Sequence, residues 1–121
     1  MQNKREIGFE KEKEAVKFLQ NNGYTIVEMN FSAKCGEIDI IAKDSDCLCF
    51  VEVKYRKNTE YGTPIEAVSV KKQKRISRTA MLYLKIRNIK SDFRFDIVSI
   101  TGTQIEIIKS AFTTPAGKYY I

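Results

Sequence analysis

The sequence predicts an α/β domain with a central β-sheet covered on both sides. Two observations carry this prediction. Residues 5–21 and 69–87 have the apolar spacing of amphipathic helices. Between them, residues 37–43 and 47–55 read as two strands whose faces are both largely apolar, as in a sheet that is buried on two sides.

Composition narrows the class of protein. A chain of 121 residues, of which 43% are apolar and 30% charged, suits one globular domain spanning residues 1–121. No run of about 18 apolar residues exists to span a membrane, and the charged N-terminus lacks the apolar core of a secretory signal. We therefore expect a cytoplasmic protein with no membrane partner.

The inventory of reactive side chains is short. The chain has no histidine, which excludes a histidine general base and a Ser-His-Asp triad. Its three cysteines, Cys35, Cys47 and Cys49, are too few for a structural zinc site without histidine and read as reduced thiols. Catalysis would have to use carboxylates, lysine and a metal.

Positive charge is concentrated in the middle of the chain. The net charge is +6, and residues 54–90 hold eleven basic and two acidic side chains, whereas residues 1–53 hold seven and ten. This asymmetry favours a polyanionic partner, nucleic acid first, although excess charge can also serve solubility alone.

The first predicted helix, 5–21, carries one acid on its apolar side. Glu12 precedes Ala15, Val16 and Leu19 at helical spacing, so it shares their inward face. The alternative is a carboxylate that simply favours the positive end of the helix. A strand at 24–28 and a connecting loop at 29–36 are expected to follow.

Charged residues lie inside the two apolar strands. If Ser45 and Asp46 form a two-residue turn, Asp44 pairs with Cys47 and Asp39 lies opposite Glu52. Alternation along the strands then gathers Asp39, Glu52 and Lys54 at one end of one face and places Ile38 and Ile40 together on the other. The same register sets Glu37 opposite Lys54, so a plain cross-strand ion pair is the alternative role for this lysine.

The second predicted helix, 69–87, has Ser69 as its N-cap and an apolar stripe that Gln73 extends by one turn. Basic residues crowd its N-terminal half: Lys71, Lys72, Lys74, Arg75 and Arg78. These residues form either a solvated face of the helix or a set of contacts to phosphates. A second hairpin is predicted at 93–100 and 104–109. The tail 110–121 has no periodicity, and we expect it to be flexible.

Two carboxylates facing each other on adjacent strands repel, and a divalent cation between them removes the conflict. Mg²⁺ prefers oxygen ligands and is typically held by one or two carboxylates plus phosphate oxygens, and Mn²⁺ can replace it. We therefore predict Asp39 and Glu52 as metal ligands. Lys54, two residues further along the same face, is placed to orient an attacking water or to neutralise a phosphate. These parts suit phosphodiester hydrolysis.

Taken together, these residues resemble a known family. Asp39 followed by Glu52-Val53-Lys54 is similar to the PD-(D/E)xK nuclease superfamily. The closer resemblance is to the YraN-like family of bacterial proteins, whose pattern appears as Gly8 with Glu12, Gly23-Tyr24, Asn30, GEID at 36–39, FVEVK at 50–54, the basic helix and Arg94-Phe95-Asp96. In place of the proline of the superfamily's name stands Ile38.

The resemblance implies a restriction-endonuclease-like three-layer core, a mixed sheet with helices on both sides. It also implies a catalytic set of Glu12, Asp39, Glu52 and Lys54, joined by Gln73 or Lys72 from the following helix. The expected activity is Mg²⁺-dependent cleavage of DNA, with branched DNA as a candidate substrate and a homodimer as the simplest way to cut two strands. The alternatives are a nucleic-acid-binding protein that performs no chemistry, and an interaction protein in which the charges form a structural network.

Overall fold

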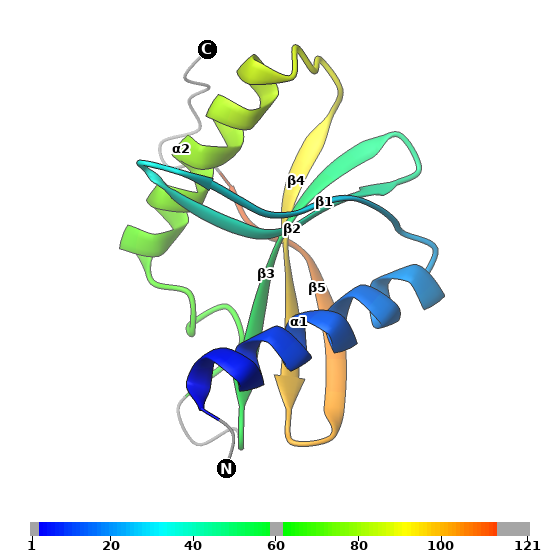
Figure 1. Ribbon diagram of the computed structural model, residues 1–121, viewed down its shortest axis with the longest axis vertical. Coiled ribbons are helices and arrows are strands. Elements are labelled where there is room, and N and C mark those ends of the chain that lie inside the picture. Colours follow the sequence, from blue (N-terminus) through cyan, green and yellow to red (C-terminus); the bar gives the residue numbers. More distant parts are fainter. Residues whose placement is uncertain (1–2, 59–61, 114–121) are drawn as a thin grey trace.

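The computed structural model describes residues 3–58 and 62–113 (Figure 1). The chain forms two helices and five strands in the order αβββαββ. Their bounds are α1 Lys4–Asn21, β1 Thr25–Ala33, β2 Gly36–Asp44, β3 Cys47–Arg56, α2 Val70–Ile86, β4 Phe93–Thr101 and β5 Gln104–Phe112. Among the described residues, neither helix is long and apolar enough to cross a membrane.

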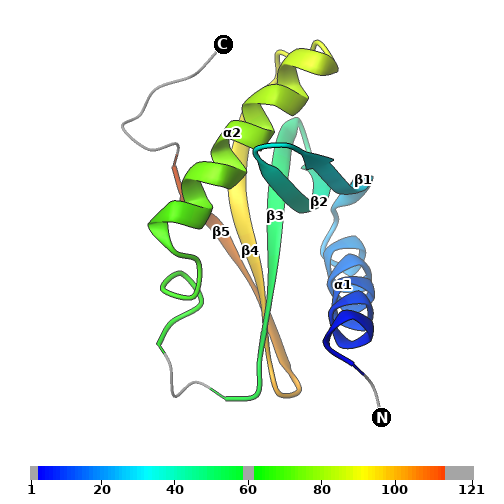
Figure 2. The ribbon, with the colours of Figure 1, turned by 60° about the vertical axis from the view of Figure 1, so that its left-hand side comes forward.

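The five strands form one mixed sheet in the order β1-β2-β3-β4-β5. Only β3 and β4 run parallel, because α2 connects them and returns the chain to the same end of the sheet. Figure 2 shows α2 and α1 on opposite faces of the sheet. The predicted α/β architecture, with a mixed sheet between two helical layers, is therefore confirmed, and it is consistent with a restriction-endonuclease-like core.

A separate apolar core lies on each face of the sheet. Under α2, buried side chains such as Ile41, Phe50 and Tyr83 pack together. Under α1, Leu19 packs with Val51 and other strand residues. Burial on both faces explains why the strands read as nearly continuous apolar runs.

Local sequence signals fix the ends of both helices, and the cap at Ser69 is the predicted one. The Asn3 side chain accepts a hydrogen bond from the Glu6 backbone N–H at 2.9 Å and caps α1. The α1 helix ends at Asn21, and Gly23 follows with a φ of +88°, a conformation that glycine adopts without strain. Ser69 caps α2 by accepting from the Lys72 N–H at 3.1 Å.

Two segments predicted as irregular are strand. The expected loop at 29–36 is wrong, because β1 continues to Ala33 and turns directly into β2. Asn30 permits this by adopting a φ of +51°, which asparagine tolerates better than most residues. At the other end, β5 extends to Phe112, so the first part of the expected tail is paired with β4. Residues 114–121 of that tail, and 59–61 of the turn after β3, lie outside the described residues.

The predicted alternation fails at one point in β2. Ile38 packs in the core under α2 together with Ile41, whereas Ile40 belongs to the core under α1. The two isoleucines therefore do not share a face. The change occurs where β2 leaves β3, since the last paired residues of the two strands are Ile40 and Val51.

Candidate active site

The fork between β2 and β3 holds the charged strand residues. The predicted two-residue turn and its register are confirmed, with Asp44 opposite Cys47 and pairing that ends at Ile40 and Val51. Beyond that pair, an Asp39 carboxylate oxygen accepts a hydrogen bond from the Val53 backbone N–H at 2.9 Å. The side chain of Asp39 thus replaces the backbone partner that β3 loses when β2 diverges.

Asp39 and Glu52 interact directly at this fork. Glu52 is only 4% exposed. Burial raises the pKa of Asp39 to about 8, and the charge of Glu52 and a hydrogen bond with its carboxyl group act in the same direction. The hydrogen bond from Val53 lowers this pKa but does not outweigh those effects. Asp39 is therefore largely protonated near neutral pH, because its carboxyl group is buried against a second one.

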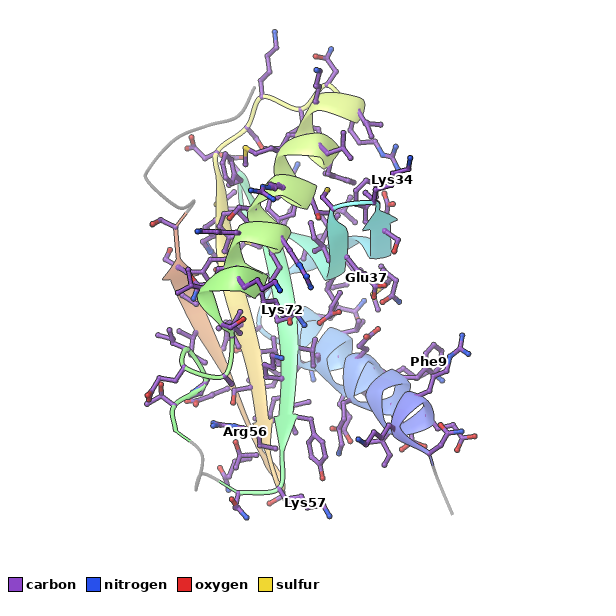
Figure 3. The ribbon with its side chains drawn as sticks, turned by 90° about the vertical axis from the view of Figure 1, so that its left-hand side faces the viewer. Phe9, Lys34, Glu37, Arg56, Lys57 and Lys72 are labelled. Atoms are coloured by element: carbon purple, nitrogen blue, oxygen red, sulfur yellow. The ribbon has the colours of Figure 1, made fainter. Side chains whose placement is uncertain are left out.

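Two lysines approach Glu52 from the other side. Lys72 Nζ lies 2.7 Å from Glu52 Oε2, and Lys54 Nζ lies 3.8 Å from the same oxygen. Burial by itself lowers the pKa of Lys72, but the hydrogen bond and negative charge of Glu52 outweigh burial and raise it. Figure 3 views this side of the molecule, with Lys72 extending from α2 and Glu37 at the start of β2.

The alternative role predicted for Lys54 is not the one that the structure gives it. Its ion pair is with Glu52 on its own strand. Glu37 instead accepts a hydrogen bond from Ser32 Oγ on β1 at 3.4 Å, because the start of β2 pairs with β1 after the fork. Lys54 therefore stays with the two acids.

Glu12 reaches the fork from α1. It is half-buried on the inward face of the helix, as predicted. Burial raises the pKa of Glu12, and the charges of Glu37 and Glu52 raise it further, against a hydrogen bond from the Asn30 side chain that lowers it. Glu12 is thus within electrostatic range of Glu52. We call Glu12, Asp39, Glu52, Lys54 and Lys72 the fork cluster.

Gln73 does not join the fork cluster. Its amide Nε2 donates to the Val68 backbone carbonyl at 3.0 Å, just before α2 begins. Of the two neighbours offered by the resemblance, Lys72 is the one that contacts Glu52. A catalytic role for Gln73 stays a prediction to which the observed geometry adds no support.

Comparison with known proteins places the chain in a family. A family model described as "Uncharacterised protein family UPF0102" matches residues 11–100. The chain belongs to this family. A UPF0102 protein of Lachnoclostridium phytofermentans is 44% identical over 112 residues, covering 91% of this chain and 95% of that protein. A UPF0102 protein of Persephonella marina is 47% identical over 106 residues, covering 87% and 91%.

Among solved structures, the crystal structure of SSO0001 aligns with 86% of this UPF0102 chain and with 50% of its own chain. The TM-score is 0.45 and the sequence identity is 17%. None of these names states an activity, so the chemistry of the UPF0102 chain has to be argued from its residues.

The basic residues of α2 divide into two groups in this UPF0102 protein. Lys72 is engaged by Glu52, although nearly half of its side chain is exposed. The other four predicted phosphate contacts are exposed along the N-terminal half of the helix: Lys71, Lys74, Arg75 and Arg78. They form a basic ridge beside the fork cluster, and phosphate binding by this ridge stays a prediction.

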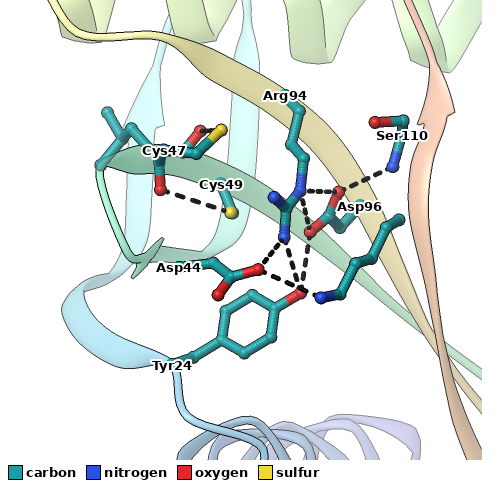
Figure 4. Close-up of polar contacts among 9 residues, drawn as sticks. Tyr24, Asp44, Cys47, Cys49, Arg94, Asp96 and Ser110 are labelled. Carbon is teal, nitrogen blue, oxygen red and sulfur yellow. Dashed lines mark hydrogen bonds and ion pairs between the residues drawn. The ribbon is translucent and has the colours of Figure 1, made fainter.

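A second charged cluster was not predicted as a unit. Asp96, fully buried on β4, accepts hydrogen bonds from Tyr24 Oη at 3.1 Å, Arg94 Nε at 3.0 Å and the Ser110 backbone N–H at 2.9 Å (Figure 4). Arg94 also donates to Asp44 at 2.7 Å. We call Tyr24, Asp44, Arg94, Asp96 and Lys109 the Arg94 cluster. Through these contacts Asp96 acts as a structural polar partner.

The described residues of the fork cluster supply only part of the ligand shell of a cation, and water or phosphate oxygens would supply the rest. Among the described residues, no group of three or more histidine, cysteine, aspartate or glutamate side chains is placed to hold a metal. Two carboxylates in contact do suit Mg²⁺ when phosphate oxygens and water complete its shell. A cation between Asp39 and Glu52 would also offset the like charge of two adjacent carboxylates, so the residues fit the ion.

Proposed function

We propose that this UPF0102 chain is a Mg²⁺-dependent nuclease of the PD-(D/E)xK superfamily that hydrolyses phosphodiester bonds in DNA. The observation that supports it most is the contact between Asp39 and Glu52 at the end of a strand ladder, with Lys54 on the same face. A stable fold gains nothing from burying two carboxyl groups against each other, whereas a cation site needs them.

Each residue of the fork cluster has a definite task in this proposal. Asp39 and Glu52 hold the cation, which when bound polarises the phosphate and lowers the pKa of a coordinated water. Lys54 holds the attacking water in line or neutralises charge that develops on the phosphate. Glu12, half-buried across the fork, orients water bound near the acids.

Lys72 keeps Glu52 neutralised when no cation is present. Its ammonium group lies 2.7 Å from a carboxylate oxygen that the cation would also need, so cation binding has to shift this lysine. Because nearly half of its side chain is exposed, Lys72 has room to turn towards a substrate phosphate. The basic ridge on α2 then holds the flanking phosphates.

A cleavage assay with Lys54 variants tests this proposal. The full-length chain is incubated with labelled four-way junction, flap, single-stranded and duplex DNA in Mg²⁺, in Mn²⁺ and in EDTA. We expect cleavage of at least one substrate with either metal and none in EDTA. Lys54→Ala should lower the rate about 100-fold, the usual cost of losing a group that stabilises transition-state charge.

Lys57→Ala is the matched control, because it removes an exposed lysine three residues further along the chain. It should cut at nearly the wild-type rate. If no substrate is cut with either metal, or if Lys54→Ala cuts as fast as wild type, the nuclease proposal fails.

One observation favours a second candidate function, a nucleic-acid-binding protein without chemistry. Glu52 already has a close ammonium partner and Asp39 already has a donor in Val53, so the acids are satisfied without a cation. This candidate predicts binding that weakens steeply with salt through the basic ridge, with no change on adding Mg²⁺. Binding without cleavage on the same substrate panel would favour it.

A further inference from the structure

An open pocket of about 830 Å³ adjoins the fork cluster. The first half of α1 forms one wall, with Gly8, Phe9 and Lys13, and Asn30 and Glu37 contribute from β1 and β2. Glu12 belongs both to this wall and to the fork cluster. Anything held in the pocket therefore lies beside Glu12 and Glu37, on the α1 side of the sheet and away from the basic ridge of α2.

Gly8 has no structural reason to be glycine. It lies within α1, where glycine costs about 1 kcal/mol relative to alanine. A Cβ atom added at this position would meet nothing within 4 Å, so no neighbouring backbone or side chain requires the space. A residue that breaks a local rule without a packing gain points to function, here to close approach of something from outside the chain.

Phe9, next to Gly8, presents an aromatic ring to the same space. It is 57% exposed, although an aromatic side chain of this size is usually buried. Lys13 Nζ lies 4.6 Å from the centre of the ring and covers it as a cation–π partner. Figure 3 shows Phe9 projecting from the outer side of α1. An exposed ring beside a lysine is the usual platform on which single-stranded nucleic acids stack their bases.

The charge of the pocket favours a base over a phosphate. Three basic side chains line it, Lys4, Arg5 and Lys13, but so do four carboxylates, Glu6, Glu10, Glu12 and Glu37. A phosphate would be repelled by that many acids, whereas carboxylates accept hydrogen bonds from the amino groups of adenine, cytosine and guanine. The ridge on α2 is entirely basic and suits phosphates, whereas this pocket suits the base of a nucleotide.

We propose that this pocket holds an unpaired base of the nucleic-acid strand whose phosphates lie along the fork cluster and the basic ridge. The base stacks on Phe9 and its sugar passes over Gly8. The proposal rests on the function proposed above, because it assumes a nucleic-acid substrate, and it adds that the substrate has a single-stranded segment. A base inside a duplex is stacked and paired and has no free face to offer.

Binding measured without metal tests the pocket. Fluorescence anisotropy of the full-length chain in EDTA compares a labelled 12-nucleotide single strand with the blunt duplex of the same sequence. Wild type should bind the single strand more tightly. Phe9→Ala should weaken single-strand binding about tenfold, the scale of one lost stacking contact, and leave duplex binding unchanged.

Gly8→Leu separates loss of the pocket from loss of the fold. Leucine favours helix and the space above Gly8 is open, so the melting temperature should not fall. Single-strand binding should nevertheless weaken as in Phe9→Ala, because the new side chain occupies the path of the strand. Ile86→Ala, which removes an equally exposed apolar side chain at the far end of α2, should bind like wild type.

The proposal that the pocket holds a base is wrong if wild type binds single strand and duplex with equal affinity. It is also wrong if either pocket variant binds the single strand as tightly as wild type. The two proposals fail separately. If the protein binds single strands through Phe9 but cuts no substrate, the pocket proposal stands and the nuclease proposal fails. If wild type and Phe9→Ala cut DNA equally well, the nuclease proposal stands and the pocket proposal fails.

Discussion

The fork cluster and the Arg94 cluster place carboxylates close together in one sheet, since Asp96 pairs with Val51, the residue before Glu52, but under opposite electrostatic conditions. In the Arg94 cluster, hydrogen bonds from Arg94 and Lys109 lower the pKa of Asp44. In the fork cluster, burial and the neighbouring Glu52 raise the pKa of Asp39. Charges of opposite sign are matched in the first cluster, and charges of like sign are pressed together in the second.

This difference separates a structural network from a candidate site. Asp96 accepts hydrogen bonds from Tyr24, which directly precedes β1, from Arg94 on its own strand and from the backbone of β5. It therefore ties β4 to two segments that are distant in the sequence. The fork cluster brings together residues of four elements, α1, β2, β3 and α2, but it keeps an internal conflict between two carboxyl groups. Proteins retain such conflicts where a ligand relieves them.

The largest effect on stability is expected in the Arg94 cluster. Asp96→Ala removes the fully buried acceptor of Arg94, Tyr24 and the Ser110 N–H at once, and leaves the half-buried Arg94 guanidinium with Asp44 alone of its two carboxylate partners in the Arg94 cluster. Breaking a buried pair in this way costs about 3–5 kcal/mol. Urea denaturation should show this loss. Asp92→Ala, which changes an exposed acid four residues earlier, should cost less than about 0.5 kcal/mol.

The fork cluster should respond in the opposite direction. Asp39→Asn keeps an acceptor for the Val53 N–H and removes the carboxylate that conflicts with Glu52, so we expect a gain of about 1–2 kcal/mol at pH 8. Asp39 stabilises the fold fully below its ordinary pKa, and this contribution is lost as pH rises through about 8.

The stability difference between Asp39→Asn and wild type should therefore be small near pH 4 and grow up to about pH 8. Thermal melts across that range measure it. A constant difference, or a loss of stability at pH 8, would remove the argument that the two acids are in conflict.

Lys72→Ala should have a smaller effect that depends on cations. Without this ammonium group the ion pair left to Glu52 among the described residues is that with Lys54 at 3.8 Å, and we expect a loss of about 1 kcal/mol in metal-free buffer. Because Mn²⁺ would take the place of the ammonium group, added Mn²⁺ should restore most of the loss. Urea denaturation with and without Mn²⁺ measures both effects. Lys74→Ala, two residues along the same helix, should show neither of them.

The smallest effect belongs to the helix cap that carries Lys72. Ser69→Ala removes the acceptor of the Lys72 N–H and should cost about 0.5–1 kcal/mol. Calorimetric melting in buffers with and without Mn²⁺ should give the same loss, since the cap lies outside both clusters. A larger loss with Mn²⁺ would mean that the cap helps to shape the cation site.

The features that could be predicted from the sequence are set by neighbours along the chain. The cap at Ser69, the two-residue turn at Ser45 and Asp46, and the resulting position of Asp39 near Glu52 all follow from spacing within a single element or hairpin. The inward direction of Glu12 follows in the same way from the helical period.

The features that could not be predicted depend on how elements pack. Consecutive helix residues point about 100° apart, so only the seating of α2 on the sheet decides that Lys72 and not Gln73 reaches Glu52. That seating needs Gly36, since a Cβ there would come within 3.1 Å of Thr79 Oγ1. The Arg94 cluster joins Tyr24 to a residue 70 positions away, and no local pattern reports such a contact.

The most direct test of the central claim is a calorimetric titration of Mn²⁺ into wild type and Asp39→Asn, without any nucleic acid. If the conflict between Asp39 and Glu52 marks a cation site, wild type should bind Mn²⁺ and the variant, although at least as stable, should bind it at least tenfold more weakly. Identical titrations of the two proteins, or no heat of binding in wild type, would contradict the account.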